Sequence, residues 1–293
     1  MRLRFGSLAL LVVLGSLLSA TVFASAQAES ANQIQIGPPQ AQRGDGPSPS
    51  DSAEELERKG DQLRGEKAFL DALDYLRAAS AKNPKSASLL NKIGIVQLQL
   101  VRYNEARKSF EAAIRLNHSF ADAHNNLGVT YYLHESAKKA AEMRSGAPRD
   151  PSKTGDFGRA IKEYRKAIQI QEDSASFHSN LGAAYFARKD FAKASASFTR
   201  ALELDPDVFE HTSRIGVAAQ ASTQGDRAEY FYLLAKMYAK KGATDRAISY
   251  LRRAMEEGYK DINNVFKDEE FAAVRKDPAF TALMKNKPVA ISD

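Results

Sequence analysis

The amino-acid sequence predicts an all-α fold made of stacked helix pairs. Glycine recurs 34 residues apart at positions 60, 94 and 128, and again at 182 and 216, and the one interval of 54 residues equals this period plus 20. From residue 53 onward the apolar residues have helical spacing, and no alternating run of β-branched residues predicts a strand. A constant period is typical of units that bury their apolar faces only against neighbours, so we expect an elongated repeat array with one insertion.

Residues 1–26 have the pattern of a secretory signal peptide. Arg2 and Arg4 give a basic start, an apolar stretch runs from Leu8 to Leu18, and Ala24 and Ala26 form an A-x-A cleavage site. We expect the mature protein to be exported, periplasmic or extracellular, without membrane contact after cleavage. The alternative is an anchor formed by an uncleaved N-terminal helix, because the uncharged stretch approaches the length that spans a bilayer.

Residues 27–52 are rich in Gln, Pro, Gly and Ser and carry few large apolar side chains. Such a segment cannot offset the entropy lost on ordering, so we expect a disordered linker. The repeat array is expected over 53–260, as units at 53–86, 87–120, 121–174, 175–208 and 228–260. Between the last two units we expect an irregular helix at 209–227. Whether this helix is half a repeat or a re-registered helix stays open.

The same residue types recur at fixed positions in each unit, most completely in 175–208. There they are Leu181, Gly182, Tyr185, Ala194, Phe198, Ala201 and Pro206. This pattern resembles the tetratricopeptide repeat, in which Gly at position 8 and Ala at position 20 let two helices approach and position 24 fills the space between units. The resemblance implies a helix-turn-helix solenoid with a right-handed superhelix, in an exported protein of bacterial type.

The third unit contains an insertion, expected at 134–153. Its first part, SAKKAAEMRS, continues the preceding helix well, whereas Gly146, Pro148 and Pro151 do not, so we expect an overlong helix followed by a loop. Its role stays open between an insertion tolerated at an exposed turn and a contact for a partner. Residues 261–287 are expected to form two short capping helices that begin near Asp268 and Asp277.

The sequence predicts no enzyme, no cofactor and no metal. It contains no phosphate-binding G-x-x-x-x-G-K-[ST], no G-x-S-x-G, no H-E-x-x-H and no G-x-G-x-x-G. Cysteine is absent, which excludes thiolate metal sites and a cysteine nucleophile. His124 and His178 share the fourth position of their units, but that position normally packs against the previous unit, so we expect packing rather than a metal pair.

The resemblance also places residues along an inner groove formed by the first helices. It implies that Asn126 and Asn180 form a short asparagine ladder that holds an extended peptide, since an amide both donates and accepts. Tyr132, Phe186 and Leu98 are the expected apolar anchors. The candidate groove residues are Leu98, Asn126, Val129, Tyr132, Asn180, Ala183 and Phe186.

We therefore expect a scaffold for a protein or peptide partner in a cell-envelope complex, and a self-associating structural spacer is the alternative. The net charge of +6 falls to +4 once Arg2 and Arg4 are removed, which favours a mixed solvated surface and no nucleic acid. An acidic C-terminus is disfavoured as ligand, because Glu57 and Asp61 replace the basic clamp of cochaperone repeats. The partner, the pathway and the oligomeric state do not follow from the sequence.

Overall fold

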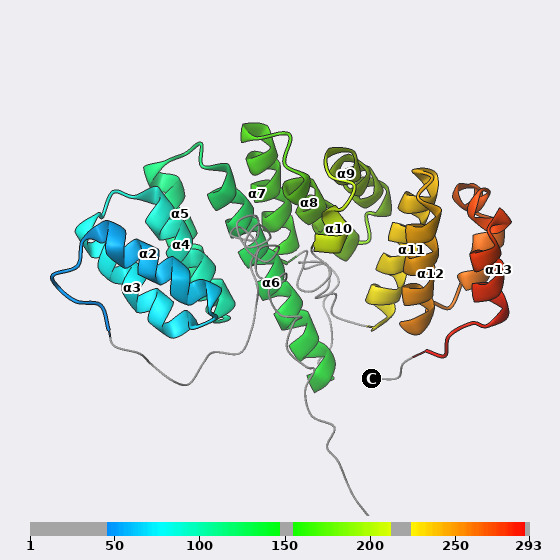
Figure 1. Ribbon diagram of the computed structural model, residues 1–293, viewed down its shortest axis with the longest axis horizontal. Helices are drawn as coiled ribbons and strands as arrows, with labels where there is room; N and C mark the ends of the chain where they lie inside the picture. The colour runs from blue at the N-terminus through cyan, green and yellow to red at the C-terminus, as the bar shows by residue number, and fades with distance from the viewer. Residues whose placement is uncertain (1–45, 147–154, 212–223, 291–293) are drawn as a thin grey trace, which may run out of the picture. The chain divides into compact units, whose positions relative to one another are not determined.

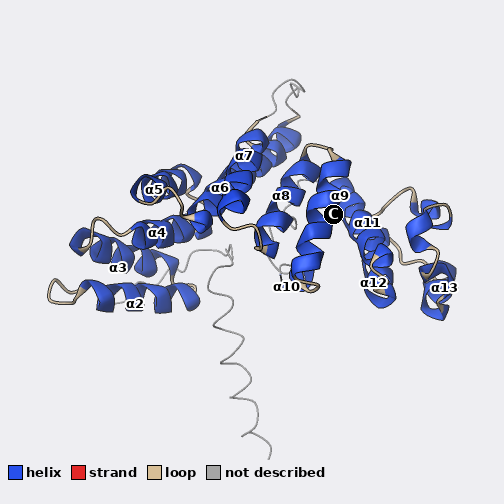
Figure 2. Cartoon of the chain, turned by 90° about the horizontal axis from the view of Figure 1, so that it is seen from above, coloured by secondary structure: helices blue, strands red, loops and turns tan. Residues whose placement is uncertain are grey.

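The computed structural model describes residues 46–146, 155–211 and 224–290. The chain divides into Met1–Gln33 and Ile34–Asp293, and every described residue belongs to the second unit. The expected signal peptide and most of the expected linker lie outside the described residues. Within the described residues the regular structure is helical and contains no strand (Figure 2).

Consecutive helices form five antiparallel pairs in chain order (Figure 1). The two helices of each pair contact each other along their length. Among the first four pairs, the second helix of one pair also contacts the first helix of the next. The all-helical prediction is confirmed. The pairs are α2 Ala53–Gly65 with α3 Phe69–Lys82, α4 Ala87–Gln99 with α5 Tyr103–Leu116, α6 Ala121–Ser145 with α7 Phe157–Ile170, α8 Ala175–Ala187 with α9 Phe191–Leu204, and α11 Gln224–Lys240 with α12 Thr244–Glu256.

Each of the first four pairs is closed by a glycine of its first helix against a large side chain of its second. A Cβ added to Gly182 would lie 2.4 Å from the Phe198 ring, and one added to Gly94 would lie 2.6 Å from Phe110. Gly60 against Leu76 and Gly128 against Tyr164 repeat this contact. The residue at position 24 thus fills the pair itself, and Phe198 also meets Phe209, which follows the pair, at 5.4 Å between ring centroids.

The core follows these contacts along the array. The residues at positions 20, 24 and 27 are fully buried in all five pairs. One apolar cluster contains buried residues from α4 to α13, and a smaller one joins α2, α3 and α4. Stability therefore comes from apolar area shared between neighbouring helices.

In the turn between the two helices of each pair, the residue at position 15 of the unit adopts the left-handed backbone conformation. Gly155 and Gly242 take this conformation at φ 54° and 77°, but Lys67, Val101 and Lys189 also adopt it, at φ 61–62°. Glycine does so without steric cost, whereas a β-branched side chain is strained there. Val101 is therefore the most strained of the five.

The end of the expected linker lies against α3. Tyr75 Oη donates to the Gly46 carbonyl oxygen at 3.3 Å, and Lys82 Nζ donates to that of Pro49 at 2.7 Å. Ser52 then begins α2 as a capping box with Glu55. The residues just before Ser52 are thus tied to the array, which the sequence analysis did not foresee.

The insertion starts as an extension of α6, which runs 25 residues to Ser145 before Gly146 ends it in the left-handed region. Residues 147–154 lie outside the described part. The chain returns at Gly155 and Asp156, where Glu135 Oε2 accepts from the Asp156 backbone N–H at 3.2 Å. A buried carboxylate of the long helix therefore fixes the start of α7.

The C-terminal cap differs from the expected two helices. Residues after Asp268 form short 3-10 turns, Ile262–Phe266 precedes them as another, and only α13 Pro278–Lys285 is α-helical. Asp277 caps α13 by accepting from the Ala279 N–H at 2.7 Å. Asp268 instead ties the cap to α11, because Tyr232 Oη donates to it at 2.9 Å.

The irregular segment is described only at its ends, as α10 Val208–His211 and the first turn of α11. Because α11 begins at Gln224, the fifth pair starts before the expected boundary at 228. The question of half a repeat or a re-registered helix falls on residues 212–223, outside the described part.

We expect Val101→Gly to stabilise the protein. A left-handed conformation costs a residue with a Cβ about 1–2 kcal/mol, and glycine loses roughly 0.5–1 kcal/mol in backbone entropy, so the net gain is about 0.5–1 kcal/mol. Thermal and urea unfolding measure it. Val101→Ala is the control and should gain less, because it keeps the Cβ; a lower unfolding free energy for Val101→Gly would contradict the strain.

Candidate functional site

The residues predicted to line a groove all lie on the first helices of the second, third and fourth pairs. Six of the seven are buried, with exposed fractions of 0–5 %, and Asn180 is half-buried. The helices are neighbours, since α6 contacts both α4 and α8. Leu98 lies on α4; Asn126, Val129 and Tyr132 lie on α6; Asn180, Ala183 and Phe186 lie on α8.

The asparagines on these helices bond to one another. Asn126 Nδ2 donates to Asn91 Oδ1 at 3.0 Å, and Asn180 Nδ2 donates to Asn125 Oδ1 at 2.9 Å. Asn125 Nδ2 lies 3.4 Å from Asn126 Oδ1, which joins both bonds into one amide ladder of four residues. A buried amide without a partner would cost about 1–3 kcal/mol, so the ladder stabilises the contact between pairs.

A lysine replaces asparagine between the first and second pairs. Lys92 Nζ lies 2.7 Å from Glu57 Oε1 and also contacts Asp61. This repeats the register of the amide ladder, in which the sixth residue of one unit donates to the fifth residue of the unit before it. Burial lowers the pKa of Lys92, but the hydrogen bonds that Lys92 donates to both carboxylates outweigh burial and raise this pKa. Arg64 Nε also lies 4.0 Å from Asp61 Oδ1, so two cations of the chain lie beside the two acids.

The predicted aromatic anchors pack into the core. The Tyr132 ring lies 5.2 Å from that of Phe157, and the Phe186 ring lies 5.5 Å from those of Phe191 and Tyr230. Burial raises the pKa of the Tyr132 hydroxyl. Both anchors already have most of their area covered, so a ligand gains little by covering more.

His124 is packed and hydrogen-bonded on both sides. Its Nδ1 lies 2.7 Å from Glu163 Oε2, and its Nε2 lies 3.2 Å from the carbonyl oxygen of His118. Both ring nitrogens thus lie within hydrogen-bond distance of an oxygen atom. His178 makes the equivalent contact to the Glu172 carbonyl oxygen, at 2.9 Å. The sequence analysis missed Glu163 because folding alone brings it to His124 from 39 residues away.

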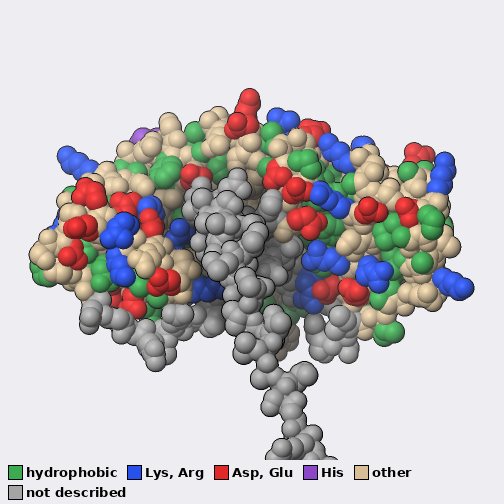
Figure 3. Space-filling model, viewed as in Figure 1, with side chains coloured by type: hydrophobic (Ala, Val, Ile, Leu, Met, Phe, Trp, Pro, Cys, Tyr) green, Lys and Arg blue, Asp and Glu red, His purple; other side chains and the backbone are tan. Residues whose placement is uncertain are grey.

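The described residues hold no group of three or more His, Cys, Asp and Glu side chains arranged to bind a metal. Among the helices described, none combines the length and the hydrophobicity needed to cross a bilayer. Positive and negative side chains are interspersed over the described part of the face in Figure 3. This mixture agrees with the expected solvated surface.

Family models of one kind match most of the array. A model described as "TPR repeat" matches residues 102–134 and 153–188, and three described as "Tetratricopeptide repeat" match 60–113, 175–208 and 231–265. Together they span more than half of the chain. The gap between 134 and 153 coincides with the insertion.

Individual relatives are distant. Small glutamine-rich tetratricopeptide repeat-containing protein 2 of Saccharomyces cerevisiae is 29% identical over 107 residues, which are 36% of this chain and only 30% of that protein. The solved structure of TTC0263, a TPR protein of Thermus thermophilus, has 20% identity and a TM-score of 0.49, over 77% of this chain and all of that one. YrrB, described as a TPR protein with an unusual peptide-binding site, has 17% identity and a TM-score of 0.44, over 84% and 97%.

Glu163 gives the fold a dependence on pH. Burial raises its pKa, but hydrogen bonds from His124 and Lys166 outweigh burial, so the pKa lies below its usual value. A lowered carboxyl pKa contributes stability that is present above the unfolded value, about 4.3, and is lost as the pH falls through the folded value.

We therefore expect Glu163→Gln to lower the free energy of unfolding by about 1.5–3 kcal/mol at pH 7, the range for hydrogen bonds to charged groups. The difference from wild type should shrink below about pH 4. Urea unfolding across this pH range measures it, with the exposed Glu203→Gln as control. A difference that stays the same at low pH would refute the assignment.

Proposed function

The chain is a tetratricopeptide repeat protein, and from this we propose that it is a non-enzymatic scaffold that holds an extended segment of a partner protein against α4, α6 and α8. Repeats of this family serve as protein-interaction scaffolds, and none of the matching family models describes an enzyme. The first helices of the middle pairs are the proposed surface because the groove positions lie there.

The amide ladder carries this proposal, because it ends at a half-buried side chain. Asn180 donates one N–H to Asn125, and its carbonyl oxygen and second N–H have no other partner among the described residues. A primary amide with one free donor and one free acceptor matches the backbone of an extended peptide of any sequence. The ladder also holds the orientation of Asn180 through Asn125.

The energies define what the partner must add. A hydrogen bond contributes roughly 0.5–1.5 kcal/mol net, whereas micromolar affinity needs about 8 kcal/mol. Only 3 % of Tyr132 and 4 % of Phe186 is exposed to solvent, so a ligand can contact little of either residue. The partner segment must therefore bring apolar contacts of its own beside Asn180.

A displayed library of random peptides, selected on the full chain, tests the proposal. We expect Asn180→Ala to weaken a selected peptide by about 2- to 12-fold, the equivalent of one hydrogen bond, in titrations of that peptide. Arg200→Ala, an exposed change on α9, is the control and should bind as wild type does. Asn126→Ala should mainly destabilise the fold, because it leaves Asn91 without its partner.

If no peptide is selected, or if Asn180→Ala binds every selected peptide as tightly as wild type, the proposed surface is wrong. A self-associating spacer is the second candidate, favoured by the exposed apolar side chains Leu116 and Ile170, which are 46 and 41 % exposed. Sedimentation of the same sample over a range of concentrations separates the two, since only the spacer gains mass.

We also propose that the protein works in the cell envelope or outside the cell, on the strength of residues 1–26. Expression in a Gram-negative host should yield a mature chain that begins at Gln27, as measured by intact mass of the periplasmic fraction. Ala26→Asp should block cleavage, whereas Ala28→Asp, just beyond the site, should not. Full-length chain retained in the cytoplasm would contradict export, and full-length chain in the inner membrane would favour the anchor.

A further inference from the structure

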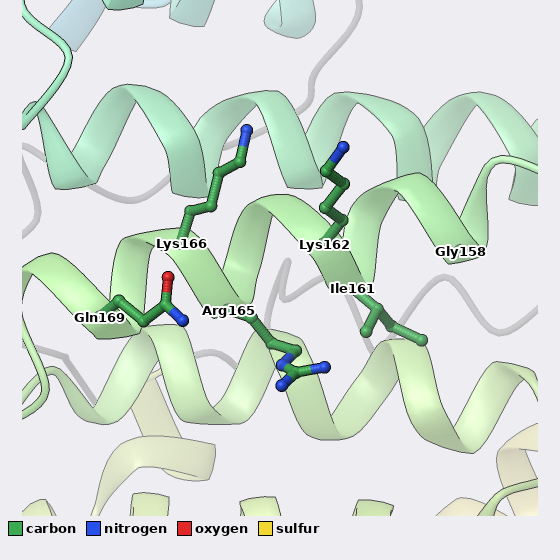
Figure 4. A pocket seen from close by; sticks show the side chains of 6 residues that line it. All are labelled: Gly158, Ile161, Lys162, Arg165, Lys166 and Gln169. Carbon is green, nitrogen blue, oxygen red and sulfur yellow. The ribbon is translucent and has the colours of Figure 1, made fainter.

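A depression lies over the outer face of α7, the second helix of the third pair. Its volume is about 330 Å³ and it is lined by Gly158, Ile161, Lys162, Arg165, Lys166 and Gln169. Residues spaced three or four apart share one face of a helix, so this lining is a continuous stripe. Figure 4 shows Lys162 and Lys166 pointing to one side of α7 and Arg165 to the other.

The charge of this stripe is not neutralised by the part of the chain that the structure describes. Lys166 pairs with Glu163 at 3.0 Å, but that carboxylate also binds His124. Lys162 and Arg165 are exposed, and neither has an acidic partner among the described residues. Two uncompensated cations therefore flank α7, on either side of the depression.

Apolar surface adjoins these cations. A second depression shares Lys166 and Gln169 with the first and is also lined by Ile114, His118, His124 and Ile170. Ile170 is 41 % exposed. The two depressions thus form one surface, the α7 surface, with Lys162 and Arg165 at one end and Ile114 and Ile170 at the other.

We propose that the α7 surface binds an acidic segment of a partner protein, in which carboxylates alternate with apolar residues. Arg165 presents a planar fork that matches a carboxylate, and Lys162 adds a second positive charge on the other side of the helix. The isoleucines accept the apolar side chains of the same segment. An acidic segment is the proposed ligand because its carboxylates carry the charge opposite to that of Lys162 and Arg165.

Nucleic acid fits less well. A duplex needs on the order of 6–10 phosphate contacts for strong binding, and the α7 surface offers three cations, one of them already paired. The apolar end has no counterpart on a phosphate backbone. This surface also lies on a second helix, so it does not depend on Asn180 or on the proposed function of the first helices.

The test measures binding of the full chain to a fluorescent peptide, Glu-Glu-Leu-Glu-Ile-Glu-Glu, by anisotropy. We expect Lys162→Glu with Arg165→Glu to weaken binding by roughly tenfold or more, because two charge-assisted contacts become repulsive. The control pair, Lys240→Glu with Arg252→Glu, makes the same change in net charge at exposed cations on α11 and α12 and should stay within about twofold. Asn180→Ala should bind like wild type.

Four results would overturn the proposal. They are no binding by wild type, equal losses in the two charge-reversal pairs, equal binding of the peptide with Gln in place of Glu, or unchanged binding by the Lys162 and Arg165 variant.

A competition experiment separates peptide from phosphate ligands, with single-stranded DNA and phosphatidylglycerol vesicles as the competitors. If either displaces the labelled peptide at a lower concentration than unlabelled peptide does, the surface binds phosphate instead. Should the reversal variant melt early, Lys162→Gln with Arg165→Gln repeats the test.

Discussion

The structure depends on the close approach of two backbones within each helix pair. A glycine in the first helix lets a leucine, phenylalanine or tyrosine of the second lie where a Cβ would stand, at 2.4–2.7 Å in four pairs. This contact fixes the separation of the two helices, and the left-handed turn residue at position 15 fixes how the chain reverses between them. Because the first four pairs share this geometry, each presents its neighbour with the same apolar face, and stacking follows.

Polar side chains set the register between pairs. Lys92 reaches back to Glu57, Asn126 to Asn91 and Asn180 to Asn125, each from the sixth residue of a unit to the fifth of the unit before. Such buried or partly buried bonds are directional, so they favour one alignment where apolar contacts alone would tolerate several. The series stops where the period breaks, and there the aromatic contacts of Phe198 with Phe209 and Tyr230 join the pairs instead.

The two layers of helices have different chemistry. The first helices of the middle pairs carry amides that are largely used within the chain, with spare capacity at Asn180. The second helices carry charge, and on α7 Lys162 and Arg165 have no acidic partner among the described residues. The two proposed binding surfaces therefore use different interactions, backbone hydrogen bonds on one layer and charge on the other.

Sequence alone determined the helical class, the period, the small residues of each pair and the extension of α6, because each depends on local spacing or on a helix period that one segment reveals. It assigned the large residue at position 24 to the space between units, whereas that residue lies against the glycine of its own pair in the first four pairs. The candidate groove residues lie on the first helices of their pairs, and their role in binding stays a prediction. Sequence alone did not foresee that Asn126 bonds to Asn91, that Glu163 meets His124, or that residues after Asp268 form 3-10 turns rather than a helix. These outcomes depend on how far one helix lies from the next, which no single segment encodes. Only the tertiary structure decided which polar groups bond to one another within the described residues.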